Sequence, residues 1–142
     1  MRKFEKINDD AKLPVRSTSG SAGYDFFANE QVVISPKEIK LVKTGIKATF
    51  DNIEALKLYN RSSNPVKKGL MLANGVGIVD SDYYGNQTND GEIMFAFYNF
   101  IDSDVIINKG DKIGQGVFEP ILFIDDDTTS GIRTGGFGST DA

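Results

Sequence analysis

Short apolar segments, separated by Gly, Asn, Asp or Pro, run through most of the chain. They are rich in Val, Ile and Phe, which favour extended backbone. The pattern predicts eight strands: QVVI (31–34), IKLV (39–42), GIKATF (45–50), IEALKLY (53–59), GVGIV (75–79), EIMFAFYNF (92–100), DVII (104–107) and KIGQGVFEPILF (112–123). Short strands at this spacing, without a convincing long helix, predict an all-β fold, a double-sheet β sandwich of jelly-roll type.

Two of these segments indicate how the strands are buried. In 45–50, Ile46, Ala48 and Phe50 alternate with polar residues, as in a half-buried strand. Residues 93–98 are apolar on both faces, so we expect a second sheet, and a neighbouring subunit, to cover that strand.

One short helix is expected after Tyr59, in NRSSNPVKKGL (60–70). Ser63 or Asn64 can cap its first turn, Pro65 suits its first position, and Gly69 can end it after about two turns. A helix N-terminus favours anions, so Arg61 and Ser62 are candidate phosphate contacts. A capped connecting turn with a solvated arginine is the preferred explanation when the segment is taken alone.

From residue 125 the pattern changes to DDDTTSGIRTGGFGSTDA, which has no apolar periodicity. We therefore divide the chain into a β domain, 1–124, and a glycine-rich C-terminal arm, 125–142. A frayed tail is the ordinary interpretation of such a segment. Its content of a cation, a flat aromatic ring and two hydroxyls among glycines instead suits a flexible lid over a nucleotide.

Composition narrows the chemistry. The 142 residues suit one domain, and the lack of Cys and His excludes disulfides, thiolate nucleophiles, Cys/His zinc sites and His-based triads. If the protein is an enzyme, a carboxylate is its expected proton acceptor.

The net charge of −4 and the absence of long basic runs argue against nucleic acid as a partner. No apolar signal core and no membrane-length apolar stretch occur, so we expect no membrane contact and a cytoplasmic protein.

The stretch VDSDYYG (79–85) has three possible interpretations. An EF-hand loop starting at Asp80 would place Tyr84 and Gly91 where calcium ligands are required, which argues against calcium. A hairpin turn fits the Asp and Gly content. A turn does not explain the preceding ANGVG. Its Asn74 and exposed backbone groups could form hydrogen bonds with the edge of a flat base, and Tyr83 could pack on a sugar. Asp80 would then lie near the group attached to that sugar.

Five stretches, in order, resemble the motifs of the trimeric dUTP pyrophosphatases (dUTPases), and together they cover nearly the whole chain. They are SAGYDFF (21–27), NRSSN (60–64), NGVGIVDSDYYG (74–85), GDKIGQ (110–115) and RTGGFGST (133–140). The resemblance implies a jelly roll of the dUTPase type and a homotrimer whose sites draw on more than one subunit, with the arm closing over a neighbouring subunit's site. It also implies hydrolysis of dUTP to dUMP and pyrophosphate with Mg²⁺.

Residue roles follow from the same resemblance. Asp80 matches the carboxylate that orients and deprotonates the attacking water, and Asp25 matches one that supports the metal through water. The matched substrate contacts are Arg61, Ser62, Ser63 and Gln115 for phosphate, Asn74, Gly77, Ile78, Val79 and Met94 around uracil, Tyr83 under deoxyribose, and Arg133, Phe137, Gly138, Ser139 and Thr140 in the lid. Asp82 has no matched role, and we expect it to brace the hairpin or a subunit contact.

The chain departs from the family pattern in three places. Asn60 and Ser63 stand where Pro and Gly are common, and GNQTNDGEI (85–93) is about five residues longer than the shortest family hairpin. That extension is either a surface loop or a contact that shapes the site or a partner surface.

Two alternatives to a dUTPase remain open on this scaffold. A related dCTP deaminase shares the fold and an RSS motif, but Ala96 stands where its catalytic glutamate is expected. A nucleotide-binding regulatory protein is the other, although Asp80 and the complete lid motif favour an enzyme. Binding of a regulatory protein partner is not defined by the sequence.

Overall fold

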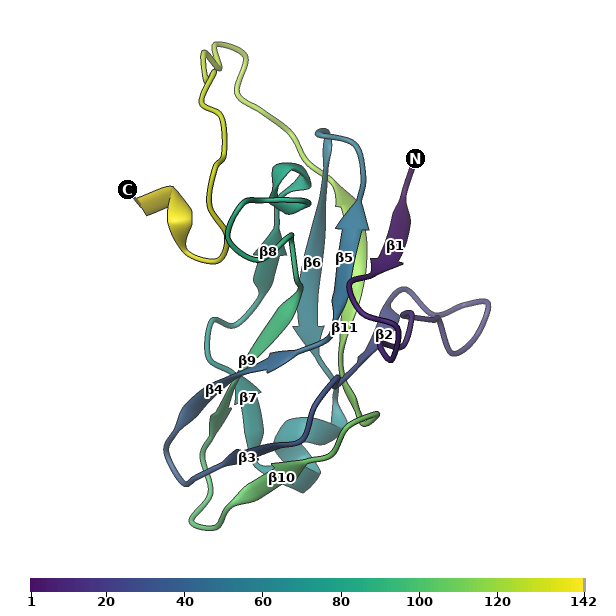
Figure 1. Cartoon of the computed structure of the whole chain (residues 1–142), viewed down its shortest axis with the longest axis vertical. Helices are drawn as coiled ribbons and strands as arrows, with labels where there is room; N and C mark the ends of the chain where they lie inside the picture. The colour runs from purple at the N-terminus through teal and green to yellow at the C-terminus, as the bar shows by residue number, and fades with distance from the viewer. Residues whose placement is uncertain (142) are drawn as a thin grey trace.

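The computed structural model describes residues 1–141, and in them the chain folds mainly into short strands (Figure 1). The strands are β1 (Lys3–Lys6), β2 (Tyr24–Phe27), β3 (Val32–Ile34), β4 (Ile39–Lys43), β5 (Ile46–Thr49), β6 (Glu54–Asn60), β7 (Leu70–Leu72), β8 (Gly77–Val79), β9 (Met94–Asn99), β10 (Val105–Ile107) and β11 (Lys112–Pro120). Three single-turn helices interrupt them: η1 (Asn64–Lys68), η2 (Ser81–Tyr83) and η3 (Ser139–Asp141). Among the described residues, no helix is long and apolar enough to cross a membrane.

The two larger sheets are antiparallel and face each other across the core. One has the order β2-β11-β6-β8 and the other β4-β9-β7, while β1-β5 and β10-β3 form two-stranded sheets. In the four-stranded sheet, Val79 lies opposite Leu56 and Gly77 opposite Leu58, whereas Gln115 lies between Asp25 and Tyr59. This register decides which site residues are neighbours.

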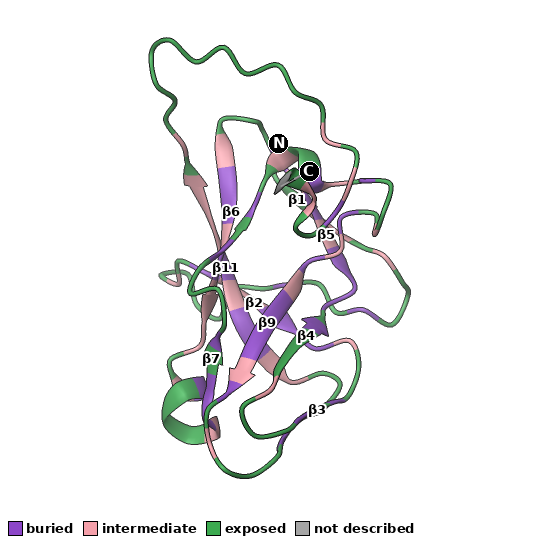
Figure 2. Ribbon diagram, turned by 90° about the vertical axis from the view of Figure 1, so that its left-hand side faces the viewer, coloured by how far each residue is buried: buried purple, intermediate pink, exposed green. Residues whose placement is uncertain are grey.

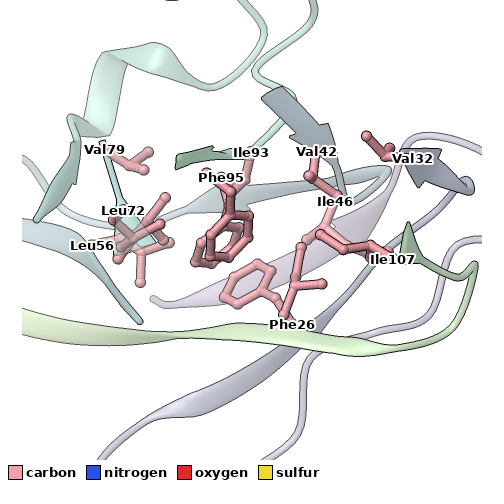
Figure 3. Packing of buried hydrophobic residues seen from close by; sticks show 14 of the residues in the cluster. Phe26, Val32, Val42, Ile46, Leu56, Leu72, Val79, Ile93, Phe95 and Ile107 are labelled. Carbon is pink, nitrogen blue, oxygen red and sulfur yellow. The ribbon is translucent and has the colours of Figure 1, made fainter. Parts of the chain in front are cut away.

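Aromatic and branched side chains fill the space between these sheets (Figure 3). Phe26 of β2 and Phe95 of β9 are fully buried, with ring centroids 5.6 Å apart. Gly114 lets Phe95 approach β11, because a Cβ at this position would lie 2.3 Å from the Phe95 ring. The core therefore fixes β11, which carries Gln115, relative to β9, which carries Met94.

The structure confirms the all-β prediction and has a strand at each of the eight predicted segments, with β4 and β6 each ending one residue later than predicted. Alternation in β5 is as expected, with Ile46 and Ala48 buried. Strand β9 is also covered at both faces within this chain, since Phe95, Ala96 and Phe97 are all buried (Figure 2). Three strands were missed: β1 carries two charged residues at its ends, β2 lies inside the motif SAGYDFF, and β7 is a three-residue segment between two motifs.

The predicted helix is present but shorter than expected. Helix η1 is a single turn of five residues rather than about two turns, and Ser63 makes no side-chain capping bond. Pro65 lies in its first turn and Gly69 ends it in the left-handed region, as predicted. Instead of a hydroxyl cap, the buried Asn64 amide holds the turn by donating to Asn60 Oδ1 and to the Ile113 carbonyl.

Candidate active site

A cavity lies between strand β8, helix η2 and the C-terminal arm. Its volume of about 170 Å³ is far more than the roughly 10–15 Å³ that one buried water needs, so it has room for a ring-shaped ligand. Its lining includes eleven of the residues assigned from the sequence: Asn74, Gly77, Ile78, Val79, Asp80, Tyr83, Met94, Arg133, Phe137, Gly138 and Thr140. Leu58, Ile93 and Gly136 line it as well.

Strand β8 supplies a free backbone edge to this cavity. In the described sheet it pairs only with β6, so the other edge of Gly77–Val79 carries N–H and C=O groups that are not paired with a strand. Such an edge can bind a partner with a complementary row of donors and acceptors. Gly77, Ile78 and Val79 all line the cavity, so this unpaired edge adjoins the ligand space.

Tyr83 forms one wall of the cavity and is held firmly. Its hydroxyl donates to the Glu92 carbonyl (2.6 Å) and accepts from Asn89 Nδ2 (2.8 Å). Burial raises the pKa of the Tyr83 phenol, so the hydroxyl remains a neutral donor well into the alkaline range. The ring is consequently fixed as a flat surface, whereas the hydroxyl is occupied by the protein itself.

The C-terminal arm crosses this cavity through Arg133. Its Nη2 donates to Asp80 Oδ2 (2.7 Å) and its Nε donates to Asp82 Oδ1 (2.9 Å). Only 9 % of the Arg133 side chain is exposed, whereas Phe137 is 56 % exposed and has a free face for stacking. Asp82 thus binds the arm, while its expected role in bracing the hairpin or a subunit contact stays a prediction.

Gly138 and Ser139 shape the end of the arm. Gly138 has φ +73°, a conformation that favours glycine, and the Ser139 N–H donates to the Gly136 carbonyl to start η3. This turn places Thr140 at the cavity. Ser139 lies beside Arg133 rather than among the lining residues, with its hydroxyl 3.5 Å from Nη1.

A second polar cluster contains the residues assigned to phosphate and metal. Asp25 Oδ2 accepts from Ser17 Oγ (2.6 Å) and lies 3.4 Å from Lys112 Nζ. Gln115 Nε2 donates to the Asn60 carbonyl (3.2 Å), and Arg61 Nη1 donates to the Lys112 carbonyl (3.2 Å). Ser62 is exposed and Ser63 half-buried beside this cluster.

Within one chain the two clusters lie apart. Val79 is opposite Leu56 on β6, and Arg61 follows five residues beyond Leu56, which corresponds to roughly 16 Å of extended strand. Figure 1 shows the same separation, with the helix after Arg61 at one end of the molecule and the arm at the other. Asp80 therefore does not meet Arg61 and Gln115 of its own chain.

Metal ligands were sought among the acidic side chains. No group of three or more acidic residues converges within residues 1–141. Asp25 is a single, largely covered carboxylate with one oxygen bonded to Ser17 and Lys112. This suits Mg²⁺, which is commonly held by one or two carboxylates together with waters and substrate phosphates.

Several polar contacts of the site were not anticipated. Asp82, Ser17 and Lys112 lie in segments already identified as motifs or next to them, but nothing in their spacing indicates which partner each one binds. The extension after Gly85 also contributes, because Asn89 binds the hydroxyl of Tyr83. The high content of polar residues in this longer hairpin, GNQTND (85–90), was the signal in the sequence that could have indicated such contacts.

Fold and site together define a class: an all-β protein with a base-sized cavity between a backbone edge, an aspartate and a cation-bearing arm. The dUTPase family profile matches residues 9–140. A deoxyuridine 5'-triphosphate nucleotidohydrolase of Lactococcus lactis is 49% identical over 148 residues, covering 100% of this chain and 99% of its own. One from a Hydrogenobaculum species is 37% identical, covering 96% and 94%.

Solved structures agree with these sequence matches. The crystal structure of dUTPase from Streptococcus mutans superimposes with a TM-score of 0.83 at 46% identity, covering 86% of this chain and 98% of that one. A dUTPase from a Staphylococcus aureus phage has the same fold, with a TM-score of 0.79 at 21% identity. The chain belongs to the dUTPase family, which confirms the resemblance found in the motifs and the predicted fold class.

Proposed function

We propose that this protein is a dUTP diphosphatase, which hydrolyses dUTP to dUMP and pyrophosphate. The observation that carries the proposal is the position of Asp80, which follows the free edge of β8 and lies in one cavity with Tyr83, Arg133 and Phe137. In a cell, this reaction limits uracil incorporation into DNA and supplies dUMP for thymidylate synthesis. We expect it to take place in the cytoplasm.

Base selection rests on the rigid edge of β8. Uracil and cytosine reverse donor and acceptor at two adjacent ring positions, so a backbone edge that pairs with one leaves groups unpaired with the other. Each unpaired buried group costs roughly 1–3 kcal/mol. Asn74 and the backbone of 77–79 are the proposed readers, with Met94 beside them and Phe137 stacked on the base.

Sugar selection rests on Tyr83. Its ring packs under deoxyribose and leaves no room for a 2′-hydroxyl, and the bonds to Glu92 and Asn89 prevent the ring from moving aside. UTP is therefore excluded by shape rather than by an opposing charge.

The chemical step uses Asp80 as a general base. An aspartate carboxylate at neutral pH can take a proton from a water molecule while the water oxygen attacks the α-phosphorus. The bond from the α-phosphorus to the oxygen that bridges it to the β-phosphorus breaks, and pyrophosphate leaves with the electron pair of that bond. Arg133, Ser139 and Thr140 of the arm bind the terminal phosphate, which requires Arg133 to exchange its bond with Asp80 for one with substrate.

Mg²⁺ is the proposed cofactor, with Asp25 supporting it through water. When bound, it neutralises charge on the phosphates and so helps pyrophosphate to leave. Arg61, Ser62, Ser63 and Gln115 complete the phosphate contacts, and Lys112 keeps the Asp25 carboxylate in place.

We further propose that the protein is a homotrimer. The separation of Asp80 from Arg61 within one chain supports this assembly, because a subunit interface can bring the base-binding cluster of one chain to the phosphate-binding cluster of another. In the structure the arm lies over the cavity of its own chain. Closure over the equivalent cavity of a neighbouring subunit, with the same contacts formed between two chains, stays a prediction.

A substrate panel tests the proposed function. With Mg²⁺ present, pyrophosphate release from dUTP should be far faster than release from dCTP, dTTP or UTP. Ammonia released from dCTP without pyrophosphate would instead identify a deaminase. Tight dUTP binding without turnover would identify a nucleotide-binding regulatory protein.

A further inference from the structure

The extension of the hairpin, residues 86–91, is an ordered loop built around Asn86. Only 8 % of Asn86 is exposed, and its Oδ1 accepts from the N–H groups of Thr88 (2.9 Å) and Asn89 (3.0 Å). Its Nδ2 donates to the Tyr83 carbonyl (2.8 Å) and to Asn89 Oδ1 (2.7 Å). This buried side chain thus has four hydrogen bonds, which give the loop one defined conformation.

The loop is also fastened to the body of the β domain. Lys47 of β5 forms an ion pair with Asp90 (2.8 Å), and the Ile93 N–H donates to the Ile46 carbonyl (2.8 Å). At its base, Gly91 passes so close to Tyr84 that a Cβ would lie 2.8 Å from the Tyr84 Cα. The loop is thus a fixed platform.

This platform contacts the C-terminal arm. The Gln87 N–H donates to the Thr134 carbonyl (3.2 Å). The next contact is Gly136, which is buried: a Cβ there would lie 3.0 Å from Oδ1 of both Asn86 and Asn89. Arm residues 134–136 therefore lie across the loop, between Arg133 at the aspartates and Phe137 at the cavity.

The same two asparagines contact the sugar-facing tyrosine, since Asn89 Nδ2 donates to the Tyr83 hydroxyl and Asn86 Nδ2 to the Tyr83 carbonyl. Arm and cavity wall are consequently joined through Asn86 and Asn89. A glycine-rich segment loses much conformational entropy when it is ordered, and a preformed contact surface reduces that cost at the moment of binding.

We propose that residues 86–91 are a docking loop for the C-terminal arm, and that Asn86 and Asn89 are positioning residues that align the arm with Tyr83. The proposal rests on the proposed function, because its kinetic effect is on dUTP hydrolysis. Weakening the contact should make closure of the arm less favourable, so that KM for dUTP rises and kcat falls.

A double-mutant cycle on the full-length protein tests this contact. Asn89→Ala removes a carboxamide from the loop, and Gly136→Ala adds a methyl group 3.0 Å from the Asn89 Oδ1 atom, so that this side chain must shift. Because both changes act on one contact, the double variant should lose little more kcat/KM than the worse single variant, with a coupling of at least about threefold. The matched control is Asn52→Ala, in an exposed turn away from the site. Its effect on kcat/KM should show no coupling to that of Gly136→Ala.

A second measurement reports on the arm itself. The chain contains no Trp, so Phe137→Trp introduces a single reporter on the arm. Adding Asn89→Ala should increase acrylamide quenching of that Trp and speed amide hydrogen exchange of residues 132–140, whereas Asn52→Ala should change neither. A thermal melt of each variant shows that the compared proteins are folded.

Two outcomes would overturn the docking role: fold-changes in kcat/KM that simply multiply in the double variant, or an arm whose exchange is unaffected by Asn89→Ala. Both leave the proposed function intact if the unmodified protein hydrolyses dUTP. Failure of the unmodified protein to hydrolyse dUTP would reject the proposed function, while the exchange measurement would still test the docking loop.

Discussion

The Nη2 atom of Arg133 lies 2.7 Å from Oδ2 of Asp80, so the cation of the arm is paired with the aspartate assigned as general base. The same guanidinium binds Asp82 through Nε. Asp80 and Asp82 are 53% and 58% exposed, so the two carboxylates share one cation in similar surroundings. They form a natural pair of test sites, since only Asp80 is proposed to do chemistry.

Asp80→Asn should keep the shape of the cavity but lose the proton acceptor. We expect kcat to fall by about 10²–10⁴, the usual contribution of a general base, while a non-hydrolysable dUTP analogue still binds. Steady-state kinetics and calorimetric titration measure the two effects. Near-normal turnover would reject Asp80 as the base.

Asp82→Asn is the matched control and carries its own prediction. If Arg133 keeps its bond to Asp82 while it exchanges Asp80 for phosphate, the substitution loses one largely exposed ion pair, of about 0.2–1 kcal/mol. KM for dUTP should rise by up to about fivefold with kcat nearly unchanged. A loss of kcat as large as that of Asp80→Asn would assign chemistry to Asp82 as well.

Deletion of residues 132–142 should leave a folded protein of little activity. The buried core cluster extends from Ala11 to Ile113 and contains no residue of the arm. The deletion removes Arg133 and Phe137, so kcat/KM for dUTP should fall while the melting temperature and oligomeric state stay close to those of the full chain. An aggregating product would show that the arm is structural.

The sequence predicted eight of the strands and the hairpin after Asn74 because each depends on local pattern: β-branched runs in β3 and β10, and glycines around Asn74. The pairing of Arg133 with Asp80 joins residues 53 positions apart and depends on the path of a segment without periodicity. No local rule gives that path. Asn86 and Asn89 were identified only as part of a longer loop, because most of their partners are backbone groups and no spacing rule indicates that they also bind each other and the Tyr83 hydroxyl.

Gly114→Ala should destabilise the fold without touching a site residue directly. The added Cβ would lie 2.3 Å from the Phe95 ring, and both groups are buried between the sheets. Overpacking of this kind costs about 1–3 kcal/mol, which lowers the melting temperature by several degrees in a chain of this size. The matched control is Gly20→Ala, where nothing lies within 4 Å of the new Cβ. Equal melting temperatures for the two variants would contradict the close packing of β11 on Phe95.

Tyr83→Phe separates the ring from its hydroxyl. The variant leaves the Glu92 carbonyl and the Asn89 amide without their partner, so the free energy of unfolding at pH 7–9 should fall by roughly 1–2 kcal/mol. Burial raises the pKa of Tyr83 above its ordinary value of 10.0. Above pH 10 the unfolded chain releases the phenol proton while the folded protein keeps it. The contribution of the Tyr83 hydroxyl to the free energy of unfolding is therefore fully present below pH 10 and is lost as the pH rises through the pKa of the folded state.

The difference in unfolding free energy between wild type and Tyr83→Phe should therefore narrow above pH 10, as measured by urea unfolding at a series of pH values. Tyr98→Phe is the control, because it breaks no hydrogen bond between the described residues. Since the ring and not the hydroxyl is proposed to exclude a 2′-hydroxyl, Tyr83→Phe should still prefer dUTP strongly over UTP, whereas Tyr83→Ala should accept UTP far better. Loss of that preference in Tyr83→Phe would instead assign sugar selection to the hydroxyl and to the Asn89 bond that holds it.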